Sequence, residues 1–127
     1  MQICYYKNVI HQQIFENRVT RNPCRCSNKY LAALYLLTAN KELWDASKQI
    51  IGRKSINFSR IIPKNFTATG YTLFTVAKDI YVGEIHITIK DLCDRQLVSD
   101  QLFDLFLSAF YISRLGYAYI GIEKAPN

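Results

Sequence analysis

The sequence predicts a single, mainly α-helical domain, a small helical bundle organised around a central helical hairpin. Three observations indicate this fold. Residues 30–37 contain no charged side chain, and their apolar residues point in every direction around a helix, which is typical of a buried helix. Residues 69–82 repeat apolar side chains at helical spacing. Residues 100–115 form a third apolar helix, with Ser99 as its cap and Gly116 as its stop.

The first predicted helix covers residues 10–19. Asn8 precedes it as an N-cap, and Asn22-Pro23 ends it because proline lacks a backbone donor and disfavours a helical residue before it. The side chains that we expect on its inner face are Ile10, Ile14 and Phe15. This element is therefore a short amphipathic helix.

The central hairpin covers residues 28–51. Ser27 or Asn28 caps its first helix, and Asn40 ends that helix and caps the second one, at 41–51. The inward side chains of the second helix are Leu43, Trp44, Ala46 and Ile50. The remaining helices are expected to pack against this hairpin.

Residues 52–66 follow as a long loop without a helical period, a feature typical of a functional or a mobile segment. The loop combines four apolar residues with four basic ones. We expect some of Ile56, Phe58, Ile61 and Ile62 to be buried while Arg53, Lys54, Arg60 and Lys64 project outward.

The helix at 69–82 begins at Thr67 or Thr69 and ends at Gly83. After it, residues 84–90 alternate isoleucine with polar side chains, which indicates a half-buried strand. Its partner would be 117–123 or the N-terminal residues 2–6, so the sequence allows a small antiparallel β element.

The last long helix, at 100–115, is expected to pack on the hairpin. The residues that we expect at this contact are Leu102, Phe103, Phe106, Ala109, Phe110 and Leu115. Asp100 lies near the positive end of the helix dipole, where an acid is favourable.

The 127 residues, 50% of them hydrophobic, suffice for one domain with its own core. The first ten residues lack a secretory pattern, and no run of about twenty apolar residues indicates a membrane span. We therefore expect a cytoplasmic protein with reduced cysteines.

Cys24 and Cys26 resemble half of a zinc site, but the second close pair of ligands is missing from the sequence. His11 or His86 would complete the site only if the fold placed them beside the two cysteines. We predict no metal and no cofactor.

Charge is distributed unevenly along the chain. Residues 1–66 carry eleven Lys or Arg and three acids, a net charge of +8, whereas residues 67–127 carry five bases and seven acids, a net charge of −2. The positive electrostatic field of residues 1–66 attracts polyanions, so this half of the chain is where an anionic partner would bind. A solvated surface that maintains solubility is the alternative interpretation.

No nucleophile, phosphate-loop or metalloprotease motif is present, which favours a non-enzymatic binding protein. The candidate binding residues are Arg18, Arg21, Arg25, Lys29, Arg53, Lys54, Arg60 and Lys64, with Phe58 as a stacking platform. The expected partner is nucleic acid or an acidic, nucleic-acid-handling protein. By analogy with small phage proteins, the function could be inhibition of host nucleases such as CRISPR enzymes. The alternatives are a structural or oligomeric role, including a homo-oligomer, and a small metal-dependent enzyme.

One family resemblance rests on packing and capping positions. These are Leu36, Leu37, Asn40 and Leu43, then Gly70, Ala77, Ile80, Tyr81 and Gly83, and finally Arg114 and Gly116. In this order the chain resembles, over residues 10–116, an uncharacterised family of short, mainly helical proteins of Gram-positive bacteria and their mobile elements. The resemblance implies a helical domain of unknown function and assigns no catalytic residue.

Overall fold

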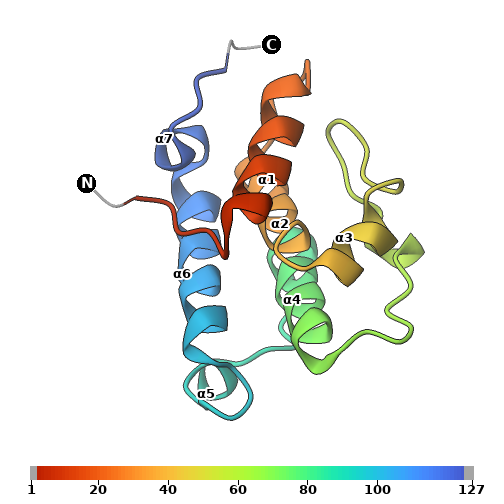
Figure 1. Cartoon of the computed structure of the whole chain (residues 1–127), viewed down its shortest axis with the longest axis vertical. Coiled ribbons are helices and arrows are strands. Elements are labelled where there is room, and N and C mark those ends of the chain that lie inside the picture. The colour runs from red at the N-terminus through yellow and green to blue at the C-terminus, as the bar shows by residue number, and fades with distance from the viewer. Residues whose placement is uncertain (1–2, 125–127) are drawn as a thin grey trace.

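The charge-free stretch of the sequence forms helix α2 (Asn28–Leu37), and the other long helices pack around it (Figure 1). The computed structural model describes residues 3–124. Every residue from Tyr30 to Leu37 is at most 3% exposed. Ser27 caps the helix by accepting a hydrogen bond from the Tyr30 amide. The predicted central helix is confirmed, and each large side chain that it buries stabilises the fold by about 1.5–3 kcal/mol.

The other elements follow in chain order. They are α1 (Val9–Arg21), α3 (Lys41–Ser47), the 3₁₀ turn η1 (Phe58–Arg60), α4 (Ala68–Lys78), the π-helical turn η2 (Asp79–Gly83), α5 (Ile89–Leu92), α6 (Asp100–Leu115) and α7 (Tyr117–Ile120). Helices α4 and α6 lie against α2. Helix α1 also contacts α2 and lies in front of it in the view of Figure 1. The helical-bundle prediction is confirmed.

The β element is not observed within residues 3–124. Residues 84–88 form an irregular loop, and α5 begins directly after Thr88, which caps it together with Asp91. Ile85 and Ile89 are 83% and 80% exposed, and of the three alternating isoleucines Ile87 alone packs against the core, where it is half-buried. The strand prediction was wrong because alternation stabilises a strand only beside a partner strand, and this fold provides none.

The two expected partners of that strand also differ from the prediction. Residues 117–123 contain the helical turn α7, which lies between Gly116 and Gly121, both at positive φ. Residues 3–6 are irregular, and Gln2 lies outside the described residues. Within residues 3–124, β-type backbone pairing is limited to an isolated antiparallel bridge between Ile51 and Ile56.

Helix α1 has the predicted cap Asn8 but runs from Val9 to Arg21, beyond the predicted bounds of 10–19, and its inner face is different. Ile10 is 65% exposed, and the neighbouring His11 is buried in its place. Phe15 is buried and Ile14 is half-buried. A polar side chain replaces an aliphatic one at this contact because both ring nitrogens of His11 find hydrogen-bond partners.

Helix α6 has its predicted bounds, with a face rotated from the expected one. Leu102, Phe106 and Ala109 are buried as predicted, and Leu105 and Ile112 join them. Phe103 and Leu115 were wrongly expected in the contact; they are 37% and 52% exposed, and Phe110 is half-buried. None of the described helices is long and apolar enough to cross a bilayer.

Helix α3 ends at Ser47, four residues earlier than predicted. The Ser47 hydroxyl donates to the Leu43 carbonyl, and the chain then turns into residues 52–66. Ile56, Phe58 and Ile61 of this loop are buried, whereas Ile62 is exposed and the four basic residues are all exposed. The loop is therefore anchored to the core by apolar side chains, as predicted.

Candidate anion-binding site

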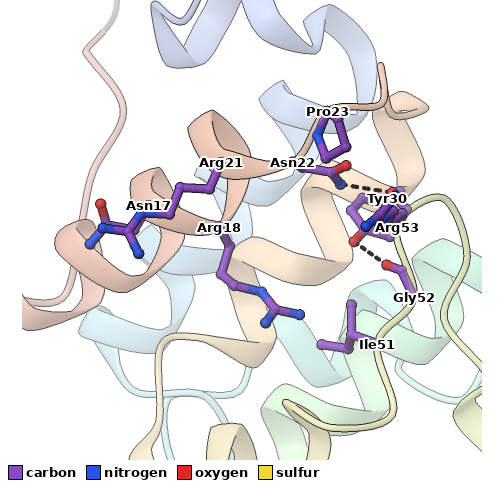
Figure 2. Close-up of a pocket in the computed structure, with 9 residues that line it drawn as sticks. All are labelled: Asn17, Arg18, Arg21, Asn22, Pro23, Tyr30, Ile51, Gly52 and Arg53. Carbon is purple, nitrogen blue, oxygen red and sulfur yellow. Dashed lines mark hydrogen bonds between the residues drawn. The ribbon is translucent and has the colours of Figure 1, made fainter.

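A hollow of about 520 Å³ lies beside the C-terminal end of α1 (Figure 2). Two segments that are distant in the sequence form it. The residues that line it are Asn17, Arg18, Arg21, Asn22 and Pro23 from α1 and the turn after it, Tyr30 from α2, and Ile51, Gly52 and Arg53 from the segment after α3. The hollow therefore joins the two basic clusters that the sequence shows separately.

Three side-chain hydrogen bonds hold the segment at 52–53 in this place. The Asn22 amide donates to the Arg53 carbonyl at 2.7 Å, and the Cys26 thiol donates to the same oxygen at 3.3 Å. The Tyr30 hydroxyl donates to the Gly52 carbonyl at 2.6 Å. Burial raises the pKa of Tyr30 to about 12, so it remains a neutral donor at physiological pH.

The turn after α1 is held from the C-terminal side of the chain. The Lys124 ammonium donates to the Val19 carbonyl at 2.7 Å and also to the Asn22 carbonyl. The Arg25 guanidinium in turn donates to the Lys124 carbonyl at 2.8 Å. A cation at the last carbonyls of a helix satisfies acceptors that the helix itself leaves open. The rim of the hollow is thus fixed in part by Lys124, which lies near the C-terminal end of the described chain.

Arg18, Arg21 and Arg53 supply the positive charge of the hollow. None of the three lies within 4.0 Å of a carboxylate in the described part of the chain. The Arg18 guanidinium is stacked 5.1 Å from the ring centre of Trp44, which orients it. In Figure 2 it points toward Ile51, whereas Arg21 extends away from Gly52. The three guanidinium groups are thus available to an external anion.

The other predicted basic residues lie outside the hollow. The Arg25 guanidinium is 4.7 Å from the ring centre of Tyr117, and the Lys29 ammonium is 5.1 Å from that of Tyr81. Lys54, Arg60 and Lys64 are exposed and do not line it. The structure therefore brings together three of the eight predicted bases.

Phe58 is not a stacking platform. It is 4% exposed, and its ring packs 5.9 Å from Phe74 and 5.6 Å from Tyr81, measured between ring centres. The Tyr81 hydroxyl accepts a hydrogen bond from the Ile56 amide and closes this contact. The prediction failed because an aromatic residue in a loop gains more by joining a nearby core than by remaining exposed.

The sequence interpretation missed the polar and apolar lining of the hollow, which consists of Asn17, Asn22, Pro23, Tyr30, Ile51 and Gly52. Asn22-Pro23 was identified as a helix terminator, and Asn22 has a second function as the donor to Arg53. An asparagine at a helix end is a local signal for backbone capping. It contains no information about a partner 31 positions away.

The residues that were considered for a metal site, Cys24 and Cys26 with His11 or His86, include two that have other structural functions, Cys26 and His11. The Cys26 thiol is buried against the Arg53 carbonyl, and burial raises its pKa, so the thiol form persists. His11 is also bonded through both ring nitrogens. Among residues 3–124, a group of three potential metal ligands is formed instead by Asp79, Glu84 and His86.

That group already has partners within the chain. Asp79 accepts hydrogen bonds from the His86 and Ile87 amides and from the His86 ring, and Glu84 lies 3.8 Å from the Lys78 ammonium. Its geometry is therefore that of a brace for the loop after η2.

Comparison with protein-family models, with curated proteins and with solved structures gives no match for this chain. The geometry of the hollow is consequently the basis for a functional proposal.

Proposed function

We propose that the protein is a non-enzymatic binding protein that binds nucleic acid at the hollow beside α1. The observation that supports this proposal is that Arg18, Arg21 and Arg53 all line one hollow, without a carboxylate within ion-pair distance of them among residues 3–124. Guanidinium groups bind phosphate oxygens through paired hydrogen bonds, and a phosphate would supply the missing negative charge.

The size and lining of the hollow fit part of a nucleic-acid strand. Its volume of about 520 Å³ falls in the range of small-ligand sites, about 300–1,000 Å³. Pro23, Tyr30 and Ile51 give it an apolar side next to the arginines. One phosphate can therefore lie against the guanidinium groups while a sugar or base contacts the apolar side, which favours a single strand over a duplex.

The surrounding surface extends the positive field beyond the hollow. Lys54, Arg60 and Lys64 are exposed on the loop that follows Arg53, and Arg25 and Lys29 flank the start of α2. Long-range attraction of this kind raises the rate at which a polyanion reaches the surface. We therefore assign direct phosphate contacts to the three arginines, and long-range attraction of the nucleic acid to the other five basic residues.

The direct test is binding of a labelled single-stranded oligonucleotide of mixed sequence, followed by fluorescence anisotropy. The triple variant Arg18→Gln, Arg21→Gln, Arg53→Gln should lose at least about tenfold in affinity at low salt because it loses three phosphate contacts. The matched control is Lys41→Gln, Lys90→Gln, Arg95→Gln, which removes the same charge from exposed positions outside the hollow. Equal weakening in both variants would contradict a localised site.

Salt dependence distinguishes nucleic acid from an acidic protein. Each phosphate contact with a single strand contributes about 0.7 to the log–log slope, so the hollow variant should show a slope lower by about 2 than the wild type. The same titration with an acidic peptide in place of the oligonucleotide gives the comparison. Tight binding of the peptide without binding of the oligonucleotide at low salt would overturn the proposal.

A further inference from the structure

The outer face of α6 carries an apolar ridge that remains exposed, although Tyr119 of α7 and the segment at 3–5 border it. Phe103, Leu107, Tyr111 and Leu115 follow one another at four-residue steps and are 37%, 40%, 37% and 52% exposed. Residues at this spacing lie on one line along a helix surface. Helix α6 lies along one edge of the molecule in Figure 1, and the exposed fractions of the four side chains leave part of the ridge free for contact with another molecule.

The ridge is symmetric about the position of residue 109. Phe103 and Leu115 are each six residues from this midpoint, and Leu107 and Tyr111 are each two residues from it. If a second α6 helix lies antiparallel at this midpoint, Phe103 is level with the partner copy's position 115, and Leu107 with the partner copy's position 111. A ridge of this kind is complementary to itself.

The charges beside the ridge have the same symmetry with opposite signs. Asp104 lies five residues before the midpoint and Arg114 five residues after it. Both are exposed, and neither is within ion-pair distance of an opposite charge in the part of the chain that the structure describes. In the antiparallel pair each aspartate is level with the arginine of the other copy, which gives two equivalent attractions.

We propose that a second copy of this chain docks on α6, antiparallel, across a two-fold axis at residue 109. The four ridge residues would pack between the two helices as ridges pack into grooves, with Leu107 and Tyr111 at the centre. Tyr111 is already held there by stacking on Tyr119, with ring centres 5.2 Å apart. The surface is separate from the hollow beside α1, and neither proposal depends on the other.

The pairing of charges identifies the occupant. An unrelated partner would need an apolar face, but it would place no condition on the positions of Asp104 and Arg114. A second copy requires their opposite signs at equal distances from the midpoint, and the chain has both. Parallel packing would instead place like charges at the same level, which is unfavourable.

The apolar ridge is tested by sedimentation equilibrium of the whole chain at about 10 μM to 1 mM, a range suited to a small, weak interface. The wild type should associate to a dimer, and Leu107→Lys should lower the association constant at least about tenfold. Gln101→Lys is the matched control, because Gln101 is exposed on α6 away from the ridge. A wild type that remains monomeric over this range would overturn the proposal.

Charge reversal tests the antiparallel arrangement. Asp104→Arg and Arg114→Asp should each weaken the dimer about fivefold or more, because each places like charges at the same level. The double variant should regain the wild-type association constant. An equimolar mixture of the two single variants should form heterodimers. In these, both basic side chains of one variant lie level with the two acidic side chains of the other, so opposite charges pair again.

This design separates loss of folding from loss of docking. Circular dichroism of each variant reports the helical content, and recovery in the double variant or in the mixture requires that the single variants are folded. A dimer that persists unchanged in both single variants, or a double variant that remains as weak as the single ones, would contradict the antiparallel pairing.

Discussion

The two histidines of this chain connect irregular segments to helices in contrasting surroundings. His11 is 2% exposed; its Nδ1 accepts from the Lys7 amide at 3.0 Å, and its Nε2 donates to the Tyr35 carbonyl at 2.8 Å. We refer to these groups as the His11 junction. It attaches the segment before α1 to the central helix α2 through neutral backbone groups.

The His86 junction consists of His86 and Ile87 with the Asp79 carboxylate. The two backbone amides donate to one carboxylate oxygen at 2.6 and 2.9 Å, and the His86 ring donates to the other at 2.7 Å. The His86 side chain is 53% exposed. This junction attaches the loop after η2 through a charged acceptor that is 11% exposed, beside a half-exposed imidazole ring.

The comparison shows that different effects set the pKa of the titrating group in the two junctions: burial for His11 and hydrogen bonding for Asp79. Burial lowers the pKa of His11 to about 4, because the charged imidazolium loses its hydration there. Partial burial alone would raise the pKa of Asp79, but the hydrogen bonds from His86 and Ile87 lower it below its ordinary value. The two junctions should therefore weaken in different pH ranges.

The largest effect is expected from His11→Ala. The substitution removes a buried ring, leaves the Lys7 amide without its acceptor and leaves the Tyr35 carbonyl with the Thr38 hydroxyl as its remaining side-chain donor. The free energy of unfolding should therefore fall by about 3–5 kcal/mol. Urea unfolding monitored by the fluorescence of Trp44, the only tryptophan, measures this change. A loss below about 1 kcal/mol would show that the His11 junction contributes little.

The next effect is the pH dependence of stability. The pKa of His11 is about 4 in the folded protein and 6.5 ordinarily, so the unfolded chain binds the proton first as pH falls. Stability should be complete above about pH 6.5 and should fall by about 3 kcal/mol as the pH approaches 4. Urea unfolding at several pH values in the His86→Ala background measures it without the second histidine. His11→Gln keeps a side-chain donor but does not titrate, so a similar slope in this control would assign the effect to other groups.

A smaller loss is expected from Asp79→Asn. The amide presents one acceptor oxygen and places a donor group near the amides of His86 and Ile87, so stability at pH 7 should fall by about 1–2 kcal/mol. The lowered pKa of Asp79 means that its contribution is present above the ordinary carboxyl range and is lost as pH falls through the folded value. The difference between wild type and variant should accordingly shrink in strong acid, which thermal unfolding at pH 7 and pH 3 can measure.

The smallest effect is expected from His86→Ala. The two backbone amides still donate to Asp79, and only a half-exposed ring contact is lost, so the change should be below about 1 kcal/mol. Thermal unfolding at pH 7 measures it. A loss as large as that of Asp79→Asn would mean that the ring, and not the backbone, is the main contact of the His86 junction.

The N-terminal caps of the longer helices were predictable from the sequence. Asn8, Asn40 and Ser99 were expected as caps, and Ser27 and Thr67 were each one of two candidates; each of the five accepts a hydrogen bond from the amide three residues later. Such a contact depends on a few consecutive residues, so their order in the chain contains the needed information. The same holds for the charge-free stretch of α2, which can be stable only when it is buried.

Segments without such local contacts were not predictable. The alternating isoleucines of 84–90 and the aromatic ring of Phe58 could each be buried or exposed. The tertiary packing around them decided which of the two occurs. Ile85 has no core within reach and is exposed, whereas Phe58 meets Phe74 and Tyr81 and is buried.

The basic residues that line the hollow could be named from the sequence, whereas the tertiary structure decided which of them line the same hollow. Arg18 and Arg21 are three residues apart on α1, so their common side follows from helical geometry. Arg53 lines the same hollow because Asn22, Cys26 and Tyr30 bind the backbone at 52–53 across 22 to 31 positions of chain. Contacts over such separations form only after the helices have packed, and no local pattern determines them.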